Sequence, residues 1–311
     1  MSAPAAPATS ASASTSASAP RRTPVSWWRN PWRRPWILGL FTVGYLAWSL
    51  LPVAVAVLFS FNAGRSRVTW QGFSTRWYYG DPLRSVWHDQ SLHTALTYTL
   101  YLGVLVTVIT IPLGVALALG LDRWRGRIPR SANLAVIISF VLPEILIAIS
   151  LLFVATVLVT PLNLGTSGQV MGLVTYQLSY PVVIVRARLL TIGNEYEEAA
   201  VDLGASPAGA LWRVLLKMLV PAIFASAVLV FADVIDDFII VRYLSGDSST
   251  EPASVKIYNT ARAATTPALN ALATLMLVAT LVAVTIGFLA FRYFTRGEKN
   301  ARSVDVFAGE A

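Results

Sequence analysis

Acidic side chains inside long apolar stretches are the first candidates for chemistry in this sequence. Asp233, Asp236 and Asp237 lie three and four residues apart in the apolar stretch 218–241, a spacing that predicts one face of a helix. Glu144 lies in a second such stretch, 132–160. If these stretches cross a membrane, an ionised carboxylate near its centre costs at least about 2.5–3.5 kcal/mol. The four carboxylates must therefore face protein or water.

A path lined by these carboxylates favours a cationic solute, because the two stretches that carry them contain no Lys or Arg. Tyr176 and Tyr180, one helical turn apart in another apolar stretch, offer two rings for cation–π contact. Structural roles are the alternative. Asp236 or Asp237 then pairs with Arg242 or with a base of a second membrane subunit, and the tyrosines only pack. The residues themselves leave both interpretations open.

Composition places these residues in a membrane protein. With 55% hydrophobic and 13% charged residues, the chain is too apolar for a soluble globular protein. Spanning a bilayer as a helix takes about 20 residues. The six blocks that meet this length are 36–61, 94–121, 132–160, 168–190, 218–241 and 269–293. We therefore predict an all-α polytopic membrane protein with six transmembrane helices, and Pro143 predicts a kink in the third.

The polar connection 193–217 has the local signals of two short helices. Asn194 is placed to cap the first, with Glu197 three residues later, and Gly204 fits its left-handed end. Ser206 is placed to cap the second, with Pro207 at its first position. Connections are usually short, so a structured one beside the membrane predicts a docking element for a soluble partner.

The distribution of basic residues predicts the orientation. With the N-terminus inside, the inner segments carry most of the 24 Lys and Arg residues. The positive-inside rule then places both termini and the connection 193–217 in the cytoplasm of a cell-membrane protein. This topology accounts for the net charge of +8, so no nucleic-acid partner is needed to explain it.

The remaining segments complete the predicted organisation. Residues 1–35 read as a disordered Ala/Ser/Pro tail followed by a basic, Trp-rich segment at the lipid interface. The membrane domain is predicted over 36–295 and a cytoplasmic tail over 296–311. The outer connection 62–93, rich in aromatic and Arg residues, either contacts a soluble binding protein or covers the helix ends.

The connection 193–217 resembles the EAA loop of the permease subunits of binding-protein-dependent ABC importers. Lys217 stands where that family has Pro, and Pro221 can supply the bend instead. The resemblance implies the type I importer permease fold and a surface that contacts the ATPase. The residues it implies at that surface are Glu198, Ala199, Ala200, Asp202 and Gly204.

Further segments look like the spermidine/putrescine permease component C subfamily, and the match runs from about 90 to 295. They include Leu142-Pro143-Glu144-Ile145, Asp236-Asp237-Phe238-Ile239-Ile240 and Pro267-Ala268-Leu269-Asn270-Ala271-Leu272. This resemblance implies a polyamine as the solute. The residues that we predict along its path, from the charges and rings described above, are Glu144, Tyr176, Tyr180, Asp233, Asp236 and Asp237.

The resemblance also implies the partners. They are a second permease subunit, a cytoplasmic ABC ATPase dimer and an external solute-binding protein. The chain has no Gly-x-x-x-x-Gly-Lys-Ser/Thr loop, so ATP and Mg²⁺ would belong to the ATPase, and no cofactor or metal is expected here. The alternatives are a permease for Fe³⁺, an amino acid or a phosphonate, an ion-coupled carrier, or a membrane-bound Mg-dependent transferase.

Overall fold

The computed structural model describes residues 36–66, 68–124, 126–158, 164–263 and 266–308. The predicted tail and Trp-rich segment in 1–35 lie outside the described residues. The chain falls into two units, residues up to 51 and residues from 52 onward. Within the described residues the only β-type pairing is a bridge between Asn62 and Phe73, so the predicted all-α class is confirmed.

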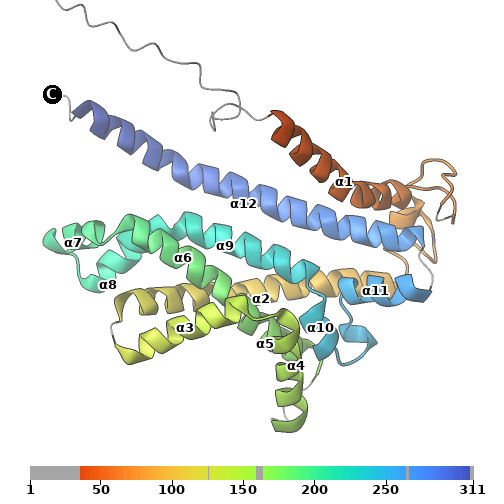
Figure 1. Cartoon of the computed structure of the whole chain (residues 1–311), viewed down its shortest axis with the longest axis horizontal. Helices are drawn as coiled ribbons and strands as arrows, with labels where there is room; N and C mark the ends of the chain where they lie inside the picture. Colours follow the sequence, from red (N-terminus) through yellow and green to blue (C-terminus); the bar gives the residue numbers. More distant parts are fainter. Residues whose placement is uncertain (1–35, 67, 125, 159–163, 264–265, 309–311) are drawn as a thin grey trace, which may run out of the picture. The chain divides into compact units, whose positions relative to one another are not determined.

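Helices make up nearly all of the described chain (Figure 1). The longer ones are α1 (Trp36–Ser60), α2 (Gln90–Arg123), α3 (Arg127–Val141), α4 (Glu144–Phe153), α5 (Thr166–Gln177), α6 (Ser179–Ile192), α9 (Leu216–Asp236) and α12 (Pro267–Ala308). The shorter ones are α7 (Glu195–Asp202), α8 (Pro207–Ala210), α10 (Ile239–Leu244) and α11 (Ala253–Ala263). Single turns of other helix types are η2 (Arg76–Gly80), η3 (Val154–Leu158), η4 (Leu211–Leu215) and η5 (Ser248–Thr250).

Five helical runs in the described residues are long and apolar enough to cross a membrane, and the bent pair α3–α4 can make a sixth. They coincide with the six predicted blocks. One of the differences lies at the end of the last block, because α12 continues as helix to Ala308, well past the predicted end of that span at 293. The predicted tail 296–311 therefore begins as a continuation of that helix.

The third block bends much more sharply than the predicted kink. α3 and α4 meet at an angle of 109°. Pro143 has no N–H to donate, and it forces the residue before it out of the helical region. Leu142 is accordingly extended, with φ −64° and ψ 138°, and Glu144 becomes the first residue of a new helix.

The fifth block ends earlier than predicted. α9 stops at Asp236, and Asp237 is extended, with φ −56° and ψ 131°. The Asp237 carboxylate accepts a hydrogen bond of 3.1 Å from the backbone N–H of Val241 in α10. A short carboxylate side chain that caps the following helix competes with continuation of the preceding one. The prediction that one helix runs through 241 was therefore wrong.

α9 lies at the centre of the larger unit, where it packs against α2, α6 and α12. Glycines allow the closest approaches between these helices. A Cβ atom added to Gly114 of α2 would lie 2.3 Å from Pro181 Cγ of α6, and one added to Gly287 of α12 would lie 2.2 Å from Val228 Cγ2 of α9. Small residues serve this purpose widely in membrane helix packing.

We expect Gly114→Ala to destabilise the protein, because the added methyl group must displace a rigid proline ring in the α2–α6 contact. Overpacking of this kind costs about 1–3 kcal/mol and outweighs the gain of about 1 kcal/mol in helix propensity. Gly120 of the same helix is the matched control, since nothing lies within 4 Å of its added Cβ. The thermal midpoint of the purified protein should fall by several degrees only for Gly114→Ala, and equal midpoints would contradict the packing argument.

Candidate functional site

Three carboxyl groups from distant parts of the sequence come together where α9 ends. The side chains of Glu144, at the start of α4, and Asp237, at the α9–α10 junction, lie close enough to interact electrostatically, and Asp233 lies nearby. We call these three residues the carboxylate cluster. Asp237 is only 8% exposed, and one oxygen of Glu144, Oε1, is buried without a hydrogen-bond partner in the described structure.

Gln177 contacts the carboxylate cluster, and the sequence analysis did not predict this. Its side chain is fully buried at the end of α5, and Nε2 donates a hydrogen bond of 2.6 Å to Asp233 Oδ2. That bond fixes the orientation of the amide, and Oε1 has no partner among the described residues. The sequence did contain a signal for this residue, because Gln177 is an amide in an otherwise apolar stretch. Two acceptor oxygens at this place, Glu144 Oε1 and Gln177 Oε1, thus lack a donor among the described residues.

Tyr176 and Tyr180 border the carboxylate cluster. Their rings are 6.3 Å apart at 80°, and both lie close enough to Glu144 and Asp233 to interact with them electrostatically. Tyr180 also contacts Phe140 of α3 edge-on, at 5.6 Å. The tyrosines are half-buried, so part of each ring can be reached. The structure therefore brings Glu144, Asp233, Asp237 and both tyrosines into one place.

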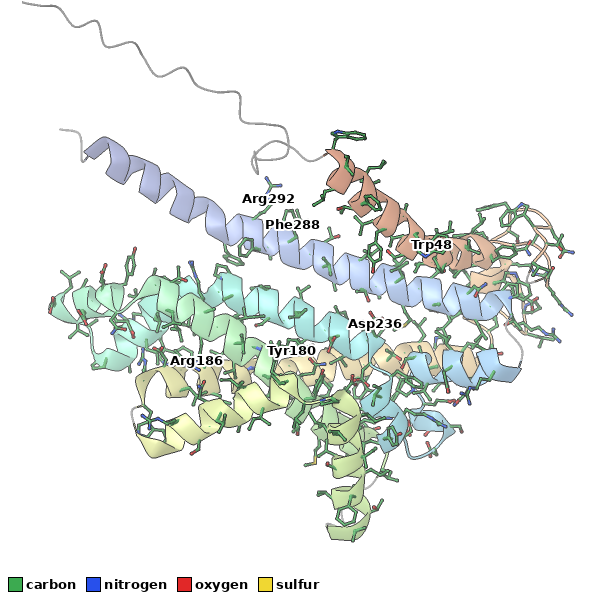
Figure 2. All side chains as sticks on the ribbon, in the orientation of Figure 1. Trp48, Tyr180, Arg186, Asp236, Phe288 and Arg292 are labelled. Atoms are coloured by element: carbon green, nitrogen blue, oxygen red, sulfur yellow. The ribbon has the colours of Figure 1, made fainter. Side chains whose placement is uncertain are left out.

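Asp236 lies apart from Glu144 and Asp237, although it is close enough to Asp233 to interact with it electrostatically. Its side chain is exposed and lines a separate small pocket of about 190 Å³ with Ser254 of α11 and Thr280 of α12 (Figure 2). The prediction of one face for Asp233, Asp236 and Asp237 was wrong, because the helix ends between the last two. Within the described chain, no ion pair joins Asp236 or Asp237 to Arg242.

The guanidinium of Arg186 is engaged away from the cluster. Arg186 follows Tyr180 along α6, and its Nη1 donates a hydrogen bond to Asn133 Oδ1 of α3. This contact ties α6 to α3. None of the ion pairs in the described residues involves a member of the carboxylate cluster. A cation that entered the cluster would thus meet acids without displacing a resident base.

α7 and α8 form the hairpin predicted between residues 193 and 217, at one end of the larger unit (Figure 1). Gly204 adopts φ +89° after α7, as the sequence predicts for a left-handed helix end. Ser206 caps α8 by accepting a hydrogen bond of 3.1 Å from Gly209 N–H. The predicted side-chain cap by Asn194 was wrong, because only its backbone carbonyl accepts bonds, from Glu197 and Glu198.

The hairpin is anchored on one side and exposed on the other. Glu197 pairs with Arg123 at the end of α2, which fixes α7 against the helical body. Glu198 and Asp202 line a shallow pocket of about 400 Å³ beside that pair. Leu203, at the tip, is 90% exposed. The bend expected from Pro221 lies elsewhere: Pro221 is inside α9, and the irregular turn is η4 at Leu211–Leu215.

The connection between α1 and α2 is folded onto the opposite end of the larger unit. Trp77 is buried there and donates a hydrogen bond of 2.6 Å to the Asn62 carbonyl. Arg76 pairs with Asp81 at 2.8 Å. The side-chain bond from Arg76, with backbone N–H groups such as that of Leu83, lowers the pKa of Asp81 to about 2. The pair therefore supports this connection at neutral pH and weakens only as the pH falls from about 4 toward 2.

Comparisons with known proteins agree with this architecture. Residues 110–300 match the family described as binding-protein-dependent transport system inner membrane component. The chain is 32% identical over 277 residues to the putrescine transport system permease protein PotI of Escherichia coli (strain K12), covering 87% of this chain and 93% of that protein. It is 32% identical over 259 residues to the spermidine/putrescine transport system permease protein PotC of the same strain, covering 83% and 95%. Its fold resembles that of a bacterial ABC transporter involved in alginate import, with a TM-score of 0.65 and 15% identity. The likeness covers 85% of this chain and 96% of that chain.

Proposed function

Since this chain belongs to the family of binding-protein-dependent transport system inner membrane components, we propose that it is the polyamine-translocating permease subunit of an ATP-driven importer. In this proposal a second permease subunit completes the membrane part. A cytoplasmic ATPase dimer docks on the α7–α8 hairpin, and an external binding protein delivers the solute. ATP binding moves the hairpin and shifts the helices between inward-open and outward-open states.

The carboxylate cluster is the observation that carries the choice of substrate. Glu144, Asp233 and Asp237 meet beside two tyrosine rings, and buried acceptor oxygens there lack donors. An ammonium group supplies both the positive charge and the N–H donors that this arrangement needs. A neutral solute would gain little from the acids, and an anion would be repelled. Relatives named for putrescine and spermidine transport add support.

Other functions have less support. A Mg-dependent transferase would need a second acidic cluster and basic groups for phosphate, and the relatives are transport permeases. An ion-coupled carrier would leave the capped α7–α8 hairpin without a role. A permease for Fe³⁺, an amino acid or a phosphonate would share the hairpin but gains no specific support from the cluster.

Uptake by the reconstituted importer tests the proposal. The two permeases and the ATPase are reconstituted in lipid vesicles. The binding protein and labelled putrescine or spermidine are added outside, and vesicles that enclose ATP are compared with vesicles that have ATP only outside. We expect uptake that requires both ATP and the binding protein. Uptake without ATP would reject the ATP-driven importer, and ATP-dependent uptake of an anion but of no polyamine would reject the cationic substrate.

The proposed orientation has its own test, in which single cysteines are added to this Cys-free chain. Leu83 of the α1–α2 connection is 78% exposed, and Leu203 at the hairpin tip is 90% exposed, so they make a matched pair. We expect Leu83→Cys to react with an impermeant thiol reagent added outside intact cells. Leu203→Cys should react only after the membrane is opened, and the reverse pattern would overturn the orientation.

A further inference from the structure

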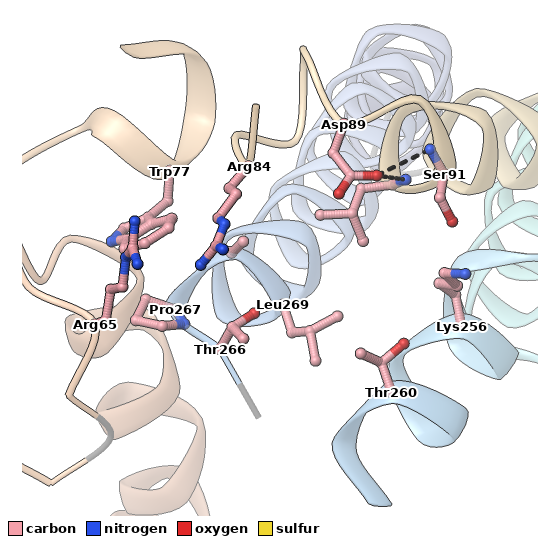
Figure 3. Close-up of a pocket in the computed structure, with 12 residues that line it drawn as sticks. Arg65, Trp77, Arg84, Asp89, Ser91, Lys256, Thr260, Thr266, Pro267 and Leu269 are labelled. Atoms are coloured by element: carbon pink, nitrogen blue, oxygen red, sulfur yellow. Dashed lines mark hydrogen bonds between the residues drawn. The ribbon is translucent and has the colours of Figure 1, made fainter. Parts of the chain in front are cut away.

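A basic pocket (Figure 3) lies beside α11 and the start of α12, at the end of the larger unit opposite the α7–α8 hairpin (Figure 1). Its volume is about 390 Å³. Its walls come from four places: the α1–α2 connection, the start of α2, the helix α11 and the start of α12. The charged residues that line it are Arg65, Arg84, Asp89 and Lys256.

The basic pocket has an apolar floor and a polar rim. Trp77, Leu92, Ala268 and Leu269 form the floor, and each is at most 6% exposed. Arg65 and Arg84 are exposed at the rim, together with Ser91 and Thr266. Arg65 and Arg84 therefore bring positive charge to the rim of a pocket whose floor is apolar.

The charges on the rim do not cancel. Asp89 caps α2, and its Oδ1 accepts hydrogen bonds of 2.9 Å and 3.2 Å from the N–H groups of Ser91 and Leu92. Lys256 lies 3.5 Å from Glu251. Arg65 and Arg84 have no ion-pair partner among the described residues. Two guanidinium groups thus bring positive charge to the opening, and no carboxylate of the described residues pairs with either of them.

These features disfavour one occupant, the transported cation, and a second, phospholipid, is distinguished by experiment. The transported cation would be repelled by Arg65 and Arg84, so the basic pocket is not an entrance for the solute. A phospholipid needs apolar surface for its acyl chains beside the site for its headgroup. The floor of this pocket is apolar, so the lipid composition is varied in the test below to separate a phospholipid from a protein partner.

We infer that the basic pocket receives carboxylate side chains on the surface of the external solute-binding protein. The inference rests on the proposed function, and it gives the α1–α2 connection a role in docking. Guanidinium groups bind carboxylates well, often through two parallel hydrogen bonds. The connection is held in shape by the buried Trp77 and by the Arg76–Asp81 pair, so the two arginines are presented from a fixed scaffold.

The test is the affinity of the assembled importer, held in lipid nanodiscs, for its purified binding protein. We expect Arg65→Glu/Arg84→Glu to raise the Kd about tenfold or more, because attraction at two positions becomes repulsion. Arg65→Lys/Arg84→Lys keeps the charge but loses the paired hydrogen bonds, so its Kd should lie between those of the wild type and the Glu variant. Arg262→Glu, on α11 but outside the pocket lining, is the matched control and should change the Kd by no more than about twofold.

Salt and lipid composition separate the remaining outcomes. Wild-type affinity should fall as ionic strength rises, and it should fall less steeply in the Glu variant. An unchanged Kd in the Glu variant, or wild-type binding that is insensitive to salt, would overturn the inference. A defect seen only in nanodiscs that contain phosphatidylglycerol, and absent in pure phosphatidylcholine, would assign the pocket to lipid and overturn it as well. Uptake of polyamine by the wild-type importer tests the proposed function separately from all of these results.

Discussion

Replacing Glu198 by Lys, together with Gly204 by Asp, is expected to reduce ATP-driven uptake to background while the chain still inserts and folds. Both residues lie on the exposed α7–α8 hairpin, so neither supports the packed core. Glu198 lines the shallow pocket next to the Arg123–Glu197 pair, where a lysine would reverse the charge offered to the ATPase. Asp tolerates the left-handed conformation of Gly204 better than most residues, so the local fold should survive.

Glu195→Lys is the matched control for this prediction. Glu195 lies in the same first turn of α7 and undergoes the same charge change, but it does not line that pocket. Uptake should be measured in vesicles beside the amount of assembled transporter and its ATP hydrolysis. We expect Glu195→Lys to retain at least about half of the wild-type uptake, because exposed charges away from a contact contribute little. Full uptake by the Glu198→Lys/Gly204→Asp variant would refute docking at this hairpin.

Asp237→Asn is expected to lower polyamine uptake about tenfold or more, whereas the same change at the adjacent Asp236 should lower it only about two- to threefold. A hydrogen bond to a charged group contributes about 1.5–3 kcal/mol, and 1.4 kcal/mol corresponds to a factor of ten. Asp237 lies in the carboxylate cluster with Glu144, and Asp236 lies outside it. Both substitutions change Asp to Asn, so they compare an acid of the carboxylate cluster with its neighbour outside the cluster.

Asparagine is chosen at position 237 because it removes the negative charge and keeps a side-chain oxygen that can accept the same hydrogen bond. Asn caps a helix about as well as Asp, so the bond to Val241 N–H and the break after α9 should remain. ATP hydrolysis stimulated by the binding protein should change much less than uptake. If hydrolysis fell in parallel with uptake, Asp237 would have a structural role only. Equal losses in Asp236→Asn and Asp237→Asn would remove the reason to place the solute at the cluster.

The overall fold was largely readable from the sequence. The length and composition of the apolar blocks predicted the membrane helices, because a bilayer admits few other structures. The ends of the hairpin helices were also predicted in part. Gly204 and Ser206 act through their own backbone and nearest neighbours, so their roles depend on few distant contacts. The side-chain cap predicted at Asn194 did not form, and Asn194 has helical backbone angles (φ −98°, ψ −9°) instead of the extended conformation typical of a capping residue.

The composition of the candidate site depended on tertiary structure. A helical period can group residues only while the helix continues, and α9 ends between Asp236 and Asp237. The sharp bend after Leu142 then allows Glu144, almost a hundred residues earlier in the chain, to reach Asp237. Gln177 enters through its bond to Asp233, a contact between helices that no local pattern signals. The sequence therefore determined which acids are costly to bury in a membrane, and only the packing of separate helix ends decided which of them meet.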